Sequence, residues 1–423
     1  MNKNLRPYLS LALLTGLNLF NYMDRYVLAA VAPPLKAELL LSDAEIGWLT
    51  SAFMIGYFTT APAFGYLGDR WPRKGLMVFG VAFWSLGTIL SGFCNDFWTL
   101  LACRVLVGLG EASFAVLAPA WLADLFPAAR RNNAMTIFYV AMPIGAALGY
   151  IVGGAALAYG GWRTAFWWAG GPGLLLVLTL LMLTEPGRGE SGNGASSGMR
   201  AGFSEFTSLF RMGDFVIIVL GLTAYTFAMG AFGAWGPTFL NRVHGMELGF
   251  ADHFFGGVLV VGGLLGTLIG GFAATAWRRK ARAGYALLLT LAAFLTLVSA
   301  TLAFLDIGLT ASMIFLGAAI FLSFLPTGPQ VTLQIESVPA HLRASAMAAS
   351  IFVIHLFGDF LSPALVGHLA DLGHDPSRPG AGLQHAMFIL PAAMSLAVLF
   401  WGWLAWRQGA RAAPSMADRG IEE

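Results

Sequence analysis

Four ionisable residues lie inside long apolar stretches of the chain. Asp24 and Arg25 are in the first of these stretches, and Arg104 and Glu111 are in the fourth. Each charge at the centre of a bilayer costs about 2.5–3.5 kcal/mol, so four unpaired charges would cost on the order of 10–14 kcal/mol. We therefore expect these side chains to face the protein interior and to pair with one another.

The depths of the four residues along their helices predict how they pair. At about 1.5 Å per residue, Asp24 and Arg104 both lie about 10–12 Å from the outer ends of antiparallel helices, and Glu111 lies about 20 Å in. This predicts an Asp24–Arg104 ion pair and leaves Glu111 less compensated. Because burial disfavours the charged form of a carboxyl, Glu111 is expected to be the main proton carrier, with Asp24 beside it.

The two arginines have the chemistry to recognise an anion. A guanidinium stays charged and can bind a carboxylate or a phosphate through two hydrogen bonds, so Arg25 and Arg104 are candidate partners of a substrate headgroup. The alternative is that the four charges only clamp two helices together. Ionisable residues inside membranes usually mark proton or substrate pathways, which favours the functional interpretation.

The composition indicates a protein surrounded by lipid. Of the 423 residues, 57% are hydrophobic and 11% are charged, against about 25% charged in a soluble domain, which excludes a soluble enzyme. The 33 Phe, 13 Trp and 10 Tyr exclude a disordered chain, which would be poor in aromatic residues. The apolar runs are continuous rather than alternating, so we expect an all-α membrane protein.

Twelve apolar runs have the length of membrane-spanning helices. They cover residues 8–32, 45–66, 76–94, 97–122, 134–159 and 164–184 in the first half, and 215–240, 254–276, 285–304, 309–335, 345–370 and 383–406 in the second. If both termini are cytoplasmic, 18 of the 24 Lys and Arg residues lie in inner loops and four in outer loops. This asymmetry predicts that orientation.

The runs divide into two six-helix bundles, at residues 1–184 and 213–407, with a tail at 408–423. Residues 185–212, rich in Gly and Ser, form the expected cytoplasmic linker between them. Within the linker, Phe203, Phe206 and Phe210 share one helical face, as in an amphipathic helix at the inner interface. An ordinary linker turn is the alternative.

The two halves are repeats of each other. Residues 124–135 align without gaps on residues 336–347, and residues 65–74 align on residues 271–280. Duplicated halves favour a transporter, because rocking one bundle against the other gives alternating access to a central site.

Several of these segments carry a family resemblance. Gly65-Tyr-Leu-Gly-Asp-Arg-Trp-Pro-Arg-Lys74 resembles the signature loop of the major facilitator superfamily. The segments that more narrowly resemble the Spinster branch of lipid transporters are Asn21-Tyr-Met-Asp-Arg25, Arg104-Val-Leu-Val-Gly-Leu-Gly-Glu-Ala-Ser113, Phe138-Tyr-Val-Ala-Met-Pro-Ile-Gly145, Glu185-Pro-Gly-Arg-Gly189 and His355-Leu-Phe-Gly-Asp-Phe-Leu-Ser-Pro363. The charge pairs also occur in related anion:cation symporters, so a small organic anion stays open as the substrate.

The resemblance also implies a gate at the cytoplasmic end. In it, Asp69 approaches the start of the helix predicted at residues 345–370, where the helix dipole favours an anion, and the loop arginines reach Asp124. Such contacts set the balance of two states rather than bind substrate. With their equivalents in the repeat, the gate residues are Asp69, Arg70, Arg73, Asp124, Arg131, Glu336 and Arg343.

Two further groups are candidates in the second half. His355 and Asp359 are four residues apart on one helix face, so they form either a second protonation site or a simple hydrogen-bonded pair. The second group consists of apolar side chains on the runs at residues 215–240 and 309–335, which either line a cavity for a hydrocarbon chain or only pack: Tyr225, Phe227, Met229, Phe232, Trp235, Phe321 and Phe324.

Searches for other chemistry find no phosphate-binding loop and no His-Glu-x-x-His motif. We therefore expect no enzyme, no cofactor, no metal and no nucleic-acid partner, and an ion gradient as the energy source. The expected partners are protons, membrane lipids and an amphipathic small molecule, with the protein as a monomer in the cell inner membrane.

The sequence as a whole predicts a proton-coupled transporter of a sphingoid phosphate or lysolipid. Gly145, Gly149 and Gly153 form a degenerate antiporter motif, which points to export in exchange for protons. The alternatives are a proton-coupled carrier of small organic anions or drugs, and a non-transporting sensor or channel.

Overall fold

The computed structural model describes residues 6–68, 70–186, 209–339 and 343–410, and this part of the chain is helical without strands. The helices of the first half are α1 (Arg6–Ala30), α2 (Ala32–Leu39), α3 (Asp43–Gly68), α4 (Arg73–Ser91), α5 (Phe97–Leu125), α6 (Ala128–Gly160) and α7 (Trp162–Met182). Those of the second half are α9 (Gly213–His244), α10 (Leu248–Lys280), α11 (Gly284–Phe304), α12 (Leu309–Phe324), α13 (Thr327–Glu336), α14 (Arg343–Ile354), a π-helical turn (His355–Asp359), α15 (Ser362–Leu372), α16 (Ala381–Met387) and α17 (Ile389–Ala410).

Every apolar run predicted from the sequence falls on one of these helices or on a consecutive group of them. Ten described helical segments are long and apolar enough to cross a membrane by length and composition. The helices α1 and α3, with 25 and 26 residues, are also long enough for the roughly 30 Å hydrocarbon core. The count of twelve spans and the cytoplasmic placement of the termini stay predictions.

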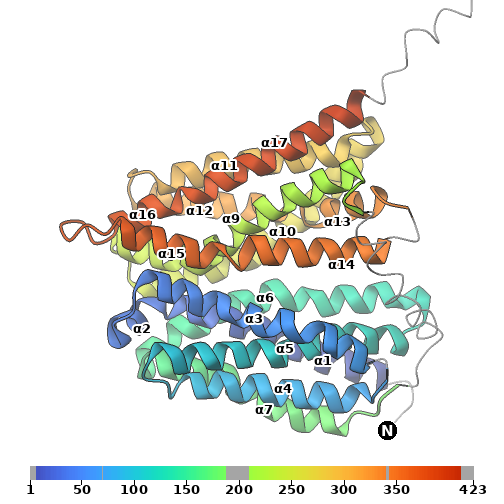
Figure 1. Ribbon diagram of the computed structural model, residues 1–423, viewed down its shortest axis with the longest axis horizontal. Helices are drawn as coiled ribbons and strands as arrows, with labels where there is room; N and C mark the ends of the chain where they lie inside the picture. The colour runs from blue at the N-terminus through green and yellow to red at the C-terminus, as the bar shows by residue number, and fades with distance from the viewer. Residues whose placement is uncertain (1–5, 69, 187–208, 340–342, 411–423) are drawn as a thin grey trace, which may run out of the picture. The chain divides into compact units, whose positions relative to one another are not determined.

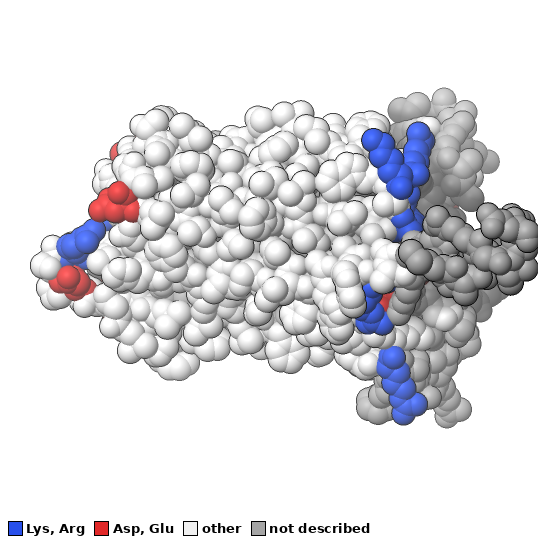
Figure 2. All heavy atoms as spheres, turned by 90° about the horizontal axis from the view of Figure 1, so that it is seen from above, with Lys and Arg blue, Asp and Glu red and all other residues white. Residues whose placement is uncertain are grey.

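Charged side chains are confined to the helix ends on the face shown in Figure 2. Acidic and basic side chains lie at both ends, and the long stretch between them carries neither. Basic residues gather where α10 finishes with Arg278, Arg279 and Lys280. A surface of this kind suits contact with lipid chains, because charge is costly away from the bilayer interface.

The chain forms two compact units. Unit 1 contains residues Met1–Gly198, Gly233–Val260 and Ser362–Ala386, and unit 2 contains Met199–Phe232, Val261–Leu361 and Met387–Glu423. Within unit 1 the six long helices of the first half run side by side with parts of α9, α10 and α15. The predicted domain boundaries at 184, 212 and 407 stay predictions, and most of the linker with Phe203 and Phe206 lies outside the described residues.

Side chains cap the N-termini of α5 and α3. Asp96 precedes α5 and accepts a hydrogen bond from the Thr99 backbone N–H at 3.0 Å, which satisfies one of the free donors of the first turn. Ser42 and Glu45 form a capping box at α3, in which Glu45 accepts from the Ser42 N–H at 2.8 Å and donates its own N–H to Ser42 Oγ at 3.1 Å.

Glycines let α5 approach its neighbours at backbone distance. A Cβ built on Gly108 would lie 1.7 Å from the carbonyl oxygen of Phe53 in α3, and one on Gly110 would lie 2.4 Å from that of Gly80 in α4. Small residues at such positions are the usual means of close helix packing in membranes. The segment Gly108-Leu-Gly110 is therefore a packing device that holds Arg104 and Glu111 against the other helices of unit 1.

We expect Gly108→Ala to lower the free energy of unfolding by about 3 kcal/mol or more, because its new methyl group would overlap a backbone oxygen that cannot move alone. Thermal unfolding in detergent measures the effect. Gly16→Ala in α1 is the control, since a Cβ there meets nothing within 4 Å and only helix propensity changes, by at most about 1 kcal/mol. Equal stability of the two variants would contradict the packing role.

Candidate functional site

Asp24 of α1 and Arg104 of α5 form an ion pair inside unit 1. Arg104 Nη1 lies 3.2 Å from Asp24 Oδ1, and the two residues are 0% and 1% exposed respectively. The Thr88 hydroxyl of α4 donates to the other Asp24 oxygen. The predicted Asp24–Arg104 pair is thus confirmed, and three helices meet at one carboxylate.

A second ion pair joins the same two helices. Arg25 Nε donates to Glu111 Oε2 at 2.8 Å. The Arg25 guanidinium also faces the rings of Tyr22, Phe53 and Tyr57, with its carbon 4.8, 5.1 and 5.5 Å from their centroids, so cation–π attraction adds to the pairing.

This second pair corrects the expectation of a poorly compensated Glu111. The depths of the residues along their helices predicted no partner for Glu111, and Arg25 was a candidate partner of a substrate headgroup. Depth ignores direction around the helix: successive side chains point about 100° apart, so Arg25 leaves α1 on a different side from Asp24 and reaches Glu111.

The four charges form a quartet with unused hydrogen-bonding capacity. Arg104 Nε and Nη2 and Glu111 Oε1 are buried and have no hydrogen-bond partner among the described residues. A buried unpaired donor or acceptor is costly, so these atoms mark a place where an anion, a proton or water would be bound favourably.

Helix α6 packs closely against α1, the helix that carries Asp24 and Arg25. A Cβ on Gly145 would lie 2.4 Å from the Leu19 carbonyl oxygen, and one on Gly149 would lie 2.6 Å from the Met23 carbonyl oxygen. Gly153 faces the Ala30 methyl group in the same way. The glycines of the predicted antiporter motif therefore bring α6 onto the α1 backbone beside Asp24, while their link to export stays a prediction.

The predicted cytoplasmic gate is described in part. Arg73 Nη1 lies 2.5 Å from Asp124 Oδ2 in unit 1, so a loop arginine does reach Asp124. Arg70 instead turns back on Tyr66, whose ring centroid is 3.6 Å from its guanidinium carbon. Asp69 and the side chain of Arg131 lie outside the described part of the chain.

Glu185 contacts the start of α4, and sequence reasoning did not predict this contact. Its two carboxylate oxygens accept the backbone N–H groups of Arg73 at 2.8 Å and Lys74 at 3.2 Å. The carboxylate therefore caps α4, where the helix dipole favours a negative charge. The 112 residues between Arg73 and Glu185 leave no local pattern that could have revealed it.

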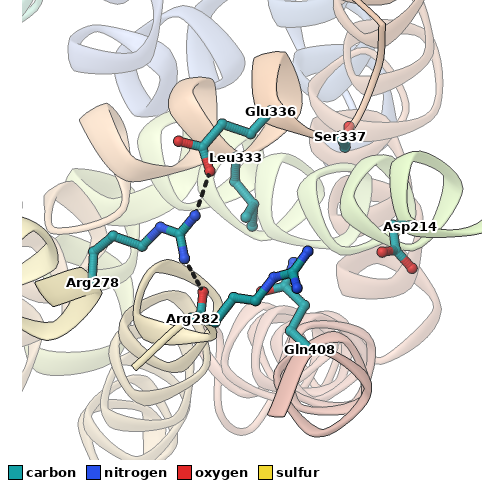
Figure 3. A pocket seen from close by; sticks show the side chains of 7 residues that line it. All are labelled: Asp214, Arg278, Arg282, Leu333, Glu336, Ser337 and Gln408. Atoms are coloured by element: carbon teal, nitrogen blue, oxygen red, sulfur yellow. Dashed lines mark hydrogen bonds and ion pairs between the residues drawn. The ribbon is translucent and has the colours of Figure 1, made fainter. Parts of the chain in front are cut away.

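The repeat equivalents belong to unit 2. Glu336 of α13 pairs with Arg278 of α10 at 3.3 Å, and the side chain of Arg343 is not among those described. Figure 3 shows that Arg278 also donates to the Arg282 carbonyl oxygen, at 2.7 Å. These residues border a polar pocket of about 190 Å³, whose other lining residues are Asp214, Leu333, Ser337 and Gln408.

Comparisons with known proteins identify the family of the chain. Residues 14–363 match the Major Facilitator Superfamily. Protein spinster homolog 1 of Xenopus laevis is 36% identical over 388 residues, covering 86% of this chain and 73% of that protein. Protein spinster homolog 3 of Danio rerio is 33% identical over 422 residues, covering 93% and 84%. The chain belongs to the Spinster branch of the major facilitator superfamily.

The fold has the same family likeness. A crystal structure of a bacterial homologue of the human lysosomal transporter Spinster, inward-facing and occupied, superposes with a TM-score of 0.83 at 24% identity and covers 97% of this chain and 99% of that one. A D-xylose–proton symporter gives 0.73 at 18% identity, covering 95% and 97%. The chain of this protein therefore has the superfamily fold and is a multi-pass membrane protein.

The second-half candidates His355 and Asp359 belong to unit 2, and the quartet belongs to unit 1. His355 Nδ1 is 2.9 Å from Asp359 Oδ2, on the π-helical turn of unit 2, and their side chains are 31% and 22% exposed. The predicted contact is present, and its role in protonation stays a prediction.

The predicted apolar set is divided between the two units, and its role as a cavity lining stays a prediction. Met229 and Phe232 border an apolar cavity of about 10 Å³ in unit 2, the size of one water molecule. Tyr225 donates to the Ser323 carbonyl oxygen, and Trp235, in unit 1, donates to the Pro363 carbonyl oxygen at 3.0 Å. Phe321 lies against glycines of α10, as does Phe324, while Phe227 is half-buried.

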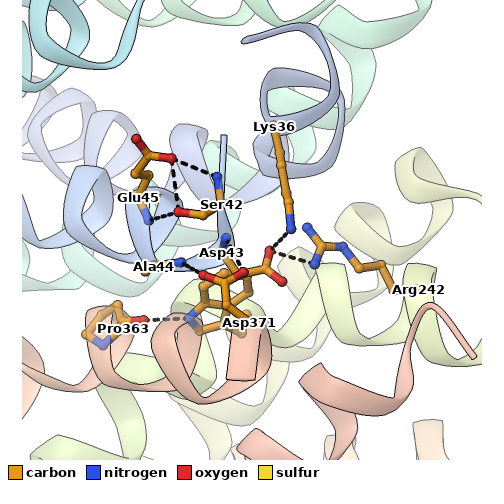
Figure 4. A network of polar contacts seen from close by, with 9 residues as sticks. Lys36, Ser42, Asp43, Ala44, Glu45, Arg242, Pro363 and Asp371 are labelled. Carbon is orange, nitrogen blue, oxygen red and sulfur yellow. Dashed lines mark hydrogen bonds and ion pairs between the residues drawn. The ribbon is translucent and has the colours of Figure 1, made fainter. Parts of the chain in front are cut away.

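A polar network at the start of α3 joins four helices of unit 1 (Figure 4). Asp43 Oδ1 accepts from Lys36 Nζ of α2 at 2.5 Å and from Arg242 Nη1 of α9 at 2.7 Å. Asp371 of α15 accepts the N–H groups of Asp43 and Ala44 at 2.8 and 2.7 Å. At the other end of α3, Arg73 Nε donates to the Gly68 carbonyl oxygen at 3.4 Å, so charged side chains contact both ends of this helix.

Sequence reasoning missed this network. The Ser42-x-x-Glu45 capping box was a visible signal for the start of α3, but Asp371 is 328 residues away from Asp43.

A separate contact joins α2 to α7. Arg163 and Trp162 donate to Glu38 of α2, and the Arg163 guanidinium holds the pKa of Glu38 below its usual range. Glu38 therefore stays ionised and ties α2 to the start of α7.

We expect Arg104→Met to reduce the free energy of unfolding by about 3–5 kcal/mol, because it leaves the Asp24 carboxylate buried without its cation. The double variant Asp24→Asn, Arg104→Met removes both charges and should regain most of that loss. Unfolding in detergent of the single and double variants gives the coupling between the two residues. Strictly additive effects would contradict a direct ion pair.

Proposed function

We propose that this protein is a proton-coupled secondary transporter that exports an amphipathic lipid of the sphingoid phosphate or lysolipid type by alternating access. The observation that carries the proposal is the buried quartet with its unpartnered Arg104 and Glu111 atoms. A purely structural clamp would be expected to satisfy those atoms, whereas a binding site leaves them for its ligand. The Spinster resemblance supports the choice of a lipid.

The quartet suggests how a headgroup and a proton would compete. The free Nε and Nη2 of Arg104 present two donors that match a phosphate or a carboxylate. A headgroup that also carries an ammonium group would place it against the Glu111 carboxylate in the position of a proton. Binding of substrate and proton then exclude each other at Glu111, and this exclusion produces exchange rather than cotransport.

The rest of the proposal follows from the family and the sequence. We assign the hydrocarbon part of the substrate to the apolar side chains of α9 and α12, and the protein to the cell inner membrane as a monomer. The Arg73–Asp124 pair supports a gating role for the signature loop, because it joins that loop to the end of α5. Opening at this end requires the pair to break.

We expect Glu111→Gln to fold and to lose the pH dependence of transport in proteoliposomes. The glutamine can still accept from Arg25 Nε, so the geometry is kept while the proton site is removed. The flux of a transported lipid is measured with and without an imposed proton gradient. Glu38→Gln is the control, because Glu38 pairs with Arg163 outside the quartet and its loss should leave coupling unchanged.

Normal coupling in Glu111→Gln would overturn the assignment of Glu111. Loss of coupling in Glu38→Gln as well would show that the assay reports general damage rather than the quartet.

The second candidate is a carrier of small organic anions, favoured by one observation. Arg25 is enclosed by the rings of Tyr22, Phe53 and Tyr57, a setting that also suits a compact anion. Substrate-driven exchange separates the two functions: we expect lysolipids and phosphorylated sphingoid bases to drive exchange and small carboxylates to fail. Exchange driven only by carboxylates would establish the second candidate.

A further inference from the structure

One acidic residue of unit 1 is buried without belonging to the quartet, to the gate or to the α3 network. Asp252 lies in the first turns of α10 and is 0% exposed. Neither of its carboxylate oxygens has a hydrogen-bond partner among the described residues. A buried acid without a donor or a cation needs a physical explanation, because its charged form is strongly disfavoured there.

Asp252 sits in a tight seam between α6 and α10. A Cβ built on Gly154 of α6 would lie 2.9 Å from Asp252 Cβ and 3.1 Å from its Oδ2. One turn further along α10, a Cβ on Gly256 would lie 2.9 Å from the Ala147 carbonyl oxygen. The two helices therefore meet at backbone distance on both sides of the carboxyl group, with no space for a hydration shell.

The titratable groups that face Asp252 offer it no positive charge. From α6, Tyr150 packs its ring 5.7 Å from that of Phe255 and donates its hydroxyl to the Gly233 carbonyl oxygen, so this donor is already used. From the turn before α10, the carboxylate of Glu247 accepts the N–H groups of Gly249 and Phe250, both at 2.9 Å. Glu247 adds a negative charge, which makes ionisation of its neighbour less favourable.

We propose that Asp252 is a proton-binding site separate from the quartet, and that the α6–α10 seam closes around it only when the carboxyl is protonated. The neutral acid fits the apolar seam, whereas the carboxylate requires water. By linkage, the closed seam binds one more proton than the separated one, so rising pH favours separation. The proposal does not require Glu111 to carry a proton.

The seam can be followed directly by a distance measurement. Spin labels at Ala158→Cys on α6 and Phe250→Cys on α10 occupy exposed positions near the same end of the two helices, in a background with Cys94→Ser and Cys103→Ser. In lipid nanodiscs we expect one short distance at acidic pH and a growing longer-distance population as the pH rises. Asp252→Asn mimics the neutral acid and should keep the short distance throughout.

Two matched variants separate the proton from packing and from nearby charge. Gly154→Ala crowds the seam without changing an ionisable group, so it should lengthen the distance at every pH and keep the pH-dependent change. Glu247→Gln removes the neighbouring carboxylate and should also keep that change. A wild-type distance that does not respond to pH, or an Asp252→Asn variant that responds as the wild type does, would overturn the proposal.

Infrared difference spectroscopy keeps the proposal testable if Asp252→Asn does not fold. The carbonyl band of a protonated carboxyl should appear in the wild type at acidic pH and persist in Glu111→Gln, because Asp252 still contributes it. Loss of the whole band in Glu111→Gln would overturn the Asp252 site while supporting Glu111 as a proton carrier. Persistence of the band together with normal transport coupling in Glu111→Gln would support Asp252 and overturn the proposed role of Glu111.

Discussion

The cost of charge in a low-dielectric interior is the constraint on which unit 1 depends. Asp24, Arg25, Arg104 and Glu111 can be buried because each meets an opposite charge on the facing helix, at 3.2 Å in one pair and 2.8 Å in the other. The pairs fix the rotation and the depth of α1 relative to α5, which apolar packing alone would leave adjustable. They also concentrate ionisable groups at one place, so the same feature that orders the helices supplies the chemistry for coupling.

Much of the fold could be predicted because composition and hydropathy act over whole helices. Each apolar run coincides with helical structure, and the Asp24–Arg104 pair followed from depth alone. The Arg25–Glu111 pair could not be predicted in this way, because it depends on the direction in which a side chain leaves its helix. Asp371 and Glu185 were missed for another reason: each caps a helix that is distant in sequence, and only the tertiary fold brings them together.

The small residues of α5 and α6 have a shared physical role. Gly108 and Gly110 bring α5 onto α3 and α4, while Gly149 and Gly154 bring α6 onto α1 and α10. In a membrane, apolar side chains gain little by leaving lipid for protein, so close backbone approach and polar contacts supply the specificity of packing. Asp24, Glu111 and Asp252 lie on the helices that these glycines bring together, so a change in their charge acts on closely packed backbones.

Glu185, just after α7, joins the end of that helix to the start of α4. It holds the first N–H groups of α4, and Arg73, the residue it caps, also binds Asp124. Glu185 comes three residues after the end of α7, so a displacement of that helix end would change the contacts of the start of α4 and of the Arg73–Asp124 pair together.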